Sequence, residues 1–162
     1  MHGVRVIAAR RRYFEGEVVM GNGPVISVVW ARRWLRAAGV YNLVWGAVMI
    51  LMPQMLFDFA GMARINYPEI WQCLGMVIGV YGIGFWIAAA DHRRHWPIVL
   101  VGLLGKVLGP IGFAMALWRG TMGWKFGVTI LTNDLVWWVP FGMMLWDASA
   151  ERGGGARGQS SR

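Results

Sequence analysis

Charged residues and cysteine are scarce in this sequence, and each shortage argues against a class of protein. Charged residues make up 15% of the 162 residues and hydrophobic residues 57%, whereas a soluble domain carries about a quarter charged residues. The single cysteine, Cys73, cannot form an intramolecular disulfide. Neither an ordinary soluble domain nor a disulfide-stabilised one fits this composition.

Histidine is also rare, and its three positions argue against bound metal or haem. His2, His92 and His95 all lie outside the long apolar runs, so those runs offer no imidazole ligand. His92 and His95 stand in the stretch DHRRH at 91–95, and a metal site would need three or four ligands there. We interpret this stretch as a polar turn between two helices, and we predict no metal and no cofactor.

Long apolar spans are what the sequence has in abundance. They cover residues 37–57, 70–90, 96–118 and 126–146, and each approaches the roughly 20 residues that a helix needs to cross a bilayer. None shows the short alternating pattern of a membrane barrel strand. The sequence therefore predicts an all-α fold within residues 32–147: an integral membrane four-helix bundle with antiparallel, up-down helices.

Most basic residues stand beside the spans, and their distribution predicts the orientation. Of the 16 Lys and Arg residues, seven precede the first span, two separate the second from the third, and three follow the fourth. The other two loops hold three, and Lys106 is the remaining one. By the positive-inside rule both termini are cytoplasmic, which predicts a multi-pass protein of the cytoplasmic (inner) membrane. Because these charges flank spans rather than one folded face, we expect no nucleic-acid partner.

Two terminal segments lie outside the predicted bundle. Residues 1–31 contain the apolar stretch VVMGNGPVISVVW, which Gly and Pro interrupt and which is too short to span, so we predict a partly disordered cytoplasmic segment. Met1 and Met20 are both candidates for the start of translation. Residues 148–162 include ERGGGARGQSSR, a composition that predicts a disordered cytoplasmic tail.

Glycines recur at helical spacing in the two central spans. The second span carries Gly75, Gly79 and Gly82, and the third carries Gly105, Gly109 and Gly112. Each triplet lines one face of a helix. Small-residue faces let membrane helices approach closely and gain dispersion contacts. We therefore predict that the second and third spans pack against each other through these glycines.

One charged residue stands inside the stretch GLLGKVLGPIGF at 102–113. A charge at mid-membrane depth is costly, so Lys106 should face the bundle interior and find a partner. Asp134 is the only acidic residue inside any predicted span. Counted from the ends of their spans, the two residues differ in depth by four positions, or about 6 Å along a helix, which a lysine side chain can bridge. The sequence predicts an ion pair between the third and fourth spans.

Other residues near this pair predict a polar intramembrane site. Pro110 removes the N–H that would bond the Lys106 carbonyl, so that carbonyl is expected to be free for another partner. Asn133 lies beside Asp134 at the same depth, and Trp137 and Trp138 follow one turn later. The two tryptophans lie too deep for the membrane interface, which leaves core packing or ligand binding.

The last span carries the residues of a family resemblance. Four short helices, with Asn133, Asp134, Trp138 and Pro140 in the fourth, resemble the DoxX-like group and, more broadly, sterol-isomerase-type EXPERA domains. The first resemblance implies a partner subunit of a quinone-linked enzyme, and the second implies a hydrophobic ligand. The several acidic and basic groups of an EXPERA-type site are absent from these spans, where Asp134 is the only acid, so isomerase chemistry is not expected.

Several functions are compatible with a buried Lys–Asp pair. It can be structural, since buried ion pairs are weak evidence of function by themselves, or it can mark a functional site. Binding of a small hydrophobic ligand, such as a lipid or quinone, or of a partner membrane subunit explains the pattern most simply. A proton- or ion-coupled carrier or channel formed by a homo-oligomer and a membrane enzyme acting on a lipid-like substrate are the alternatives. Because no nucleophile, nucleotide loop or metal cluster is recognisable, we assign no catalytic residues and favour a non-enzymatic role. The lipid bilayer itself is an expected partner.

Overall fold

The computed structural model of this protein describes residues 26–159, and it describes side chains as far as residue 152. This part of the chain is helical and contains no strand. Its elements are α2 (Val28–Leu51), α3 (Met55–Ala60), α4 (Pro68–Ala88), α5 (Trp96–Trp118), η1 (Trp124–Phe126), α6 (Gly127–Ile130), η2 (Leu131–Leu135) and α7 (Val136–Gln159).

Four helical segments are long and apolar enough to cross a membrane. They cover Val28–Leu51, Pro68–Ala88, Trp96–Trp118 and Trp124–Arg152, with mean hydropathies between 1.3 and 2.0. The prediction of an all-helical fold is confirmed for the described residues, and so is the prediction of four helices long and apolar enough to span a membrane. The predicted N-terminal segment, including Met1 and Met20, lies almost entirely outside the described residues.

The first helix is displaced from its predicted position. It was predicted at 37–57 but begins at Val28 and ends at Leu51. Because of the early start, three arginines lie in the first turns of α2. One of them contacts the end of α4, where Arg32 Nε donates to the Ala89 carbonyl at 3.3 Å. The early end precedes Pro53, which cannot continue the helix.

The fourth segment extends beyond its prediction at the far end. Residues 148–159, predicted as part of a disordered tail, continue helix α7 as far as Gln159. Contacts hold the first of these turns: Arg152 Nε donates to the Ala148 carbonyl at 3.1 Å. The Arg152 guanidinium also lies 4.1 Å from the centre of the Trp96 ring, a cation–π contact that anchors the turn to α5.

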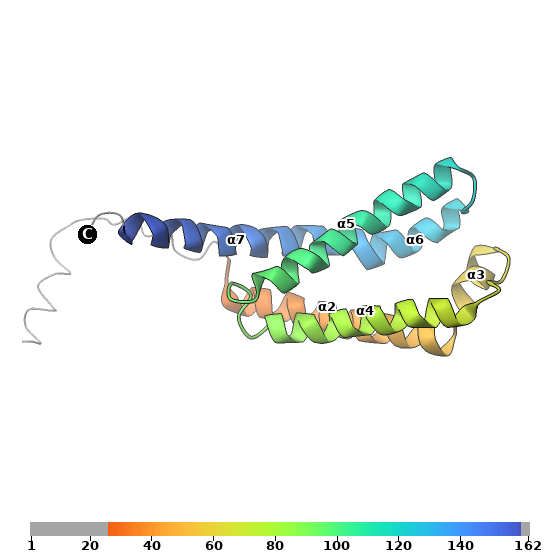
Figure 1. The fold of residues 1–162 in the computed structure, drawn as a ribbon, viewed down its shortest axis with the longest axis horizontal. Coiled ribbons are helices and arrows are strands. Elements are labelled where there is room, and N and C mark those ends of the chain that lie inside the picture. Colours follow the sequence, from red (N-terminus) through yellow and green to blue (C-terminus); the bar gives the residue numbers. More distant parts are fainter. Residues whose placement is uncertain (1–25, 160–162) are drawn as a thin grey trace, which may run out of the picture.

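The helices associate as two pairs. Figure 1 shows α2 beside α4, and α5 beside the segment formed by α6 and α7. The two pairs approach each other near the turn between α4 and α5, residues 89–95, which we call the turn end. Away from it, α5 diverges from α4 toward its own C-terminal end (Figure 1).

Glycines bring α2 and α4 together, which corrects the predicted pairing of the second span with the third. A Cβ added to Gly46 would lie 2.5 Å from the Gly75 carbonyl oxygen, and one added to Gly82 would lie 2.8 Å from the Gly39 carbonyl oxygen. Gly75 and Gly82 of α4 therefore face glycines of α2, whereas a Cβ added to Gly79 would meet nothing within 4 Å. The sequence pattern matched α4 to α5 because both carry three glycines, whereas Gly39 and Gly46 supply the closer fit.

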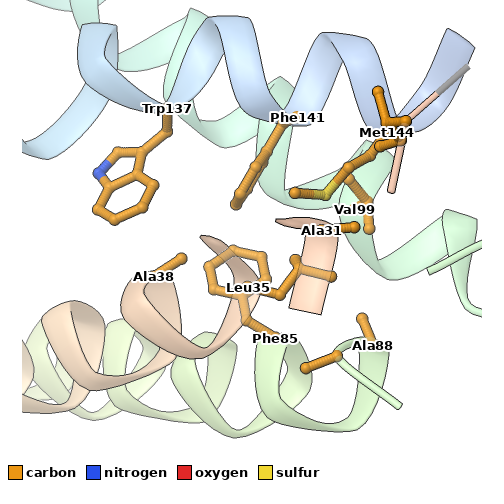
Figure 2. Close-up of a cluster of buried hydrophobic side chains, with 11 residues drawn as sticks. Ala31, Leu35, Ala38, Phe85, Ala88, Val99, Trp137, Phe141 and Met144 are labelled. Atoms are coloured by element: carbon orange, nitrogen blue, oxygen red, sulfur yellow. The ribbon is translucent and has the colours of Figure 1, made fainter. Parts of the chain in front are cut away.

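The main hydrophobic core lies toward the turn end and joins all four long helices (Figure 2). Phe85 of α4 and Phe141 of α7 meet edge to face, with ring centres 5.0 Å apart. Leu35 of α2 and Val99 of α5 are completely buried beside them. In a lipid environment this contact is favoured by dispersion and shape rather than by removal of water. It fixes the end of the bundle from which the two helix pairs spread.

Candidate functional site

A π-helical turn interrupts the fourth long apolar segment and positions its polar residues. Residues Leu131–Leu135 form this wider turn between α6 and α7, and Asn133 and Asp134 stand within it. At its end the Val136 N–H bonds to the Leu131 carbonyl. The neighbouring Thr132 carbonyl accepts the indole N–H of Trp137 at 3.2 Å. Single π-helical turns are rare and occur often at functional sites, because the extra residue redirects side chains.

The predicted ion pair is present. Lys106 Nζ lies 4.0 Å from Asp134 Oδ1, and the exposed fractions of the two side chains are 10% and 6%. Lys106 Nζ also donates to Asn133 Oδ1 at 3.4 Å. Both distances exceed the roughly 2.7–2.9 Å of a strong charge-assisted hydrogen bond. The three side chains therefore form a buried polar group whose members stand slightly apart.

Trp138 provides a hydrogen-bond partner for the Lys106 carbonyl, which Pro110 leaves without one in the helix. The indole N–H of Trp138 donates to the Lys106 carbonyl at 3.0 Å. This bond ties α7 to the residue of α5 that carries the buried charge. This one hydrogen bond involves both the carbonyl that Pro110 was predicted to expose and the predicted site residue Trp138.

A cavity of about 330 Å³ opens beside the ion pair. Its lining combines polar side chains with glycines and apolar groups: Asn42, Ile78, Tyr81, Phe85, Gly102, Gly105, Lys106, Gly109, Ile130, Asn133 and Asp134. A Cβ on Gly105 would meet nothing within 4 Å, whereas one on Gly109 would lie 2.8 Å from Asp134 Oδ2. These two glycines of α5, predicted to pack on α4, instead line this space and admit the carboxylate.

Asn42 of α2 is a polar candidate whose depth the sequence misplaced, because the predicted first span, 37–57, puts it five residues from the cytoplasmic edge. It is 3% exposed and lines the cavity, and its Oδ1 has no hydrogen-bond partner within the described part of the chain. Because α2 begins at Val28, Asn42 lies about 21 Å along the helix rather than near a membrane edge. An asparagine in a long apolar run was the available signal, but its depth depended on the helix start.

Trp137 belongs to the core rather than to the cavity. Its ring centre lies 6.0 Å from that of Trp34 and 6.1 Å from that of Phe141. Of the two readings that the sequence left open for this residue, packing is the one that the contacts support. Trp138, by contrast, reaches the site through its bond to the Lys106 backbone.

A second buried polar cluster lies at the turn end. His92 Nε2 is 2.9 Å from Asp147 Oδ2, and the exposed fractions of these side chains are 3% and 2%. Arg93 Nε donates to the same carboxylate at 2.7 Å. Within the turn, the backbone N–H groups of Arg94 and Arg93 donate to Asp91 and lower the pKa of its carboxyl. The stretch DHRRH is thus a turn, as predicted, and it is also tied to α7 by a carboxylate that the sequence did not single out.

The chain matches no protein-family model, and no curated protein and no solved structure shows significant similarity to it. The resemblance to DoxX-like and EXPERA-type proteins therefore stays a prediction.

Proposed function

We propose that this chain is a multi-pass membrane protein that binds a small hydrophobic ligand by a polar end, in the cavity beside Lys106 and Asp134. The observation that carries the proposal is the spacing of Lys106 and Asp134, which stand 4.0 Å apart beside this cavity. Buried polar groups that are incompletely paired are costly, and the buried Asn42 lines the same cavity. Ligand sites are concave and mostly apolar with a few polar groups, and they begin at about 300 Å³.

We also propose an antiparallel, up-down bundle in the cytoplasmic membrane with both termini on the cytoplasmic side. The proximity of Gly46 to Gly75 and of Gly39 to Gly82 supports opposite directions for α2 and α4. The orientation is supported by the basic residues of the turn end, where Arg32 bonds to Ala89 and Arg93 bonds to Asp147. Basic residues favour the cytoplasmic side of a membrane helix.

The test is native mass spectrometry of the protein purified from its membrane in mild detergent. We expect the unmodified protein to retain a small amphiphile. The double variant Lys106→Met with Asp134→Asn should lose it, because both charged ends of the site are removed while the side-chain volumes are nearly kept. Leu108→Met is the matched control, since Leu108 lies on the same helix with 64% exposure.

Two outcomes would contradict the binding proposal. One is retention of the same molecule by the double variant, which would place it outside the cavity. The other is a purified complex that carries no small molecule but contains a second membrane protein in fixed ratio, which would favour the role of an accessory subunit.

A further inference from the structure

We infer that the ligand of this cavity carries a neutral head group that both donates and accepts a hydrogen bond, such as a hydroxyl, rather than a ketone, a carboxylate or an amine. This inference rests on the proposed binding function and names the chemical class that the site fits. It follows from the spacing of the ion pair and from its charge balance.

The spacing of the pair leaves hydrogen-bonding capacity on both partners. Lys106 and Asp134 approach to 4.0 Å, more than 1 Å beyond a strong charge-assisted hydrogen bond, at about 2.7–2.9 Å. An ammonium group only donates and a carboxylate only accepts. A hydroxyl placed between them satisfies both, because its oxygen accepts from Lys106 while its hydrogen is donated to Asp134.

The charge balance excludes ionic head groups. The described lining of the cavity holds one ammonium and one carboxylate, so a neutral ligand leaves the site without net charge. A carboxylate or an amine ligand would be attracted to one member of the pair and repelled by the other. It would add a net charge at a depth where charge is poorly solvated.

The carboxylate separates a hydroxyl from a ketone. A ketone, which only accepts, would serve Lys106 but would leave Asp134 without a new donor. Asn42 lines the cavity from α2, but its Oδ1 is a buried atom. Because the single hydroxyl hydrogen is donated to Asp134, the Asn42 oxygen takes no part in this distinction.

The remaining lining sets the hydrocarbon part. Ile78, Tyr81, Phe85 and Ile130 present apolar and aromatic surface around the polar groups. At about 330 Å³, the cavity lies near the lower end of the range of about 300–1,000 Å³ for small-molecule sites. A compact ring attached to the head group therefore fills a volume of this size.

The test uses four probes with one rigid hydrocarbon cage: 2-adamantanol, 2-adamantanone, 2-adamantylammonium and adamantane-2-carboxylate. The full-length protein, labelled with ¹⁵N-tryptophan, is placed in lipid nanodiscs, and each probe is titrated at known concentration in the membrane. The readout is the indole N–H resonance of Trp138, which lies against the Lys106 carbonyl and is assigned from Trp138→Phe.

We expect the alcohol to bind at least about tenfold more tightly than the ketone and than either ion, because only the alcohol gives both Lys106 and Asp134 a hydrogen-bond partner without adding charge. The double variant Lys106→Met with Asp134→Asn should lose this preference. Its helix content and elution volume show whether it remains folded. If it does not, Gly105→Leu provides the second variant, because a side chain at this position enters open space beside the pair. It should weaken binding of the alcohol and reduce its advantage over the ketone.

The possible results distinguish two failures. A ketone that binds as tightly as the alcohol, or an ion that binds most tightly, overturns the inference and leaves the binding function standing. Absence of any Trp138 response to all four probes overturns both.

Discussion

At the scale of single residues, Lys106 is the point on which several contacts converge. Its ammonium faces Asn133 and Asp134, and its carbonyl accepts the indole of Trp138. All three partners come from the fourth membrane segment, so one residue of α5 is held at both its side chain and its backbone. The two halves of this arrangement can be tested separately.

The ion pair should be more sensitive to single than to double substitution. Lys106→Met or Asp134→Asn alone leaves one buried charge without compensation, a cost of about 3–5 kcal/mol in folded proteins. The double variant should recover more than half of the summed loss. Unfolding in detergent micelles, analysed as a double-mutant cycle, measures this coupling. Additive losses would show that the pair contributes no interaction energy.

The bond between Trp138 and the Lys106 carbonyl should depend on Pro110. Trp138→Phe removes the donor and should cost about 1 kcal/mol. In a Pro110→Ala background the backbone N–H of residue 110 becomes available to the same carbonyl, so the same tryptophan substitution should then cost less. The measurement is again the free energy of unfolding in micelles. An equal cost in both backgrounds would mean that the indole does not serve this carbonyl.

At the scale of elements, close backbone contact distinguishes the α2–α4 pair. Gly46 faces the backbone of Gly75, where a Cβ has no room, whereas Gly112 of α5 has nothing within 4 Å of an added Cβ. Two glycines of different helices are thus placed in opposite environments, although they look alike in the sequence.

This difference predicts opposite effects of one substitution. Gly46→Ala should destabilise the protein by about 1–3 kcal/mol, because a carbonyl oxygen cannot move aside as a flexible side chain can. Gly112→Ala should be neutral or stabilising by up to about 1 kcal/mol, since alanine lowers the entropy cost of the helix. Thermal unfolding measures the stability of both variants. A smaller loss of stability for Gly46→Ala than for Gly112→Ala would contradict the close approach of α2 to α4.

The π-helical turn is the second feature at this scale. It sets Asn133 and Asp134 toward Lys106, while Trp137 and Phe141 of α7 enter the core one and two turns later. One extra residue in the turn lets a single continuous segment serve both the cavity and the core. Sequence periodicity assumes regular helix, so it could place Asp134 at the correct depth without detecting this turn.

At the scale of the whole molecule, Asp147 closes the turn end. It comes from α7 and contacts His92 and Arg93 of the turn between α4 and α5, so it joins one helix pair to the other beside the hydrophobic core. The opposite ends of α4 and α5 lie apart in Figure 1. Because these contacts hold the two helix pairs together at the turn end, the pairs separate toward the region around the cavity.

Removal of this connection should weaken the whole bundle. Asp147→Asn should cost about 3 kcal/mol or more, because it leaves buried donors with a weaker acceptor. The control is Glu151→Gln, since Glu151 lies 3.5 Å from the same arginine but is 57% exposed, and exposed pairs contribute about 0–1 kcal/mol. Unfolding of the two variants in micelles gives the comparison. Equal losses would show that Asp147 is not a main connection between the pairs.

The amino-acid sequence alone determined that the chain is helical, that four segments are long and apolar enough to span a membrane, and that Lys106 pairs with Asp134. These results follow from segment length, composition and the cost of burying a charge, which are properties of the chain itself. Tertiary structure decided which glycines face which helix, where Asn42 lies, and that a cavity stands beside the pair. Those features depend on the rotation of each helix about its axis, on the true start of α2 and on the π-helical turn. Each is set by contacts between distant residues, and none is encoded in local spacing.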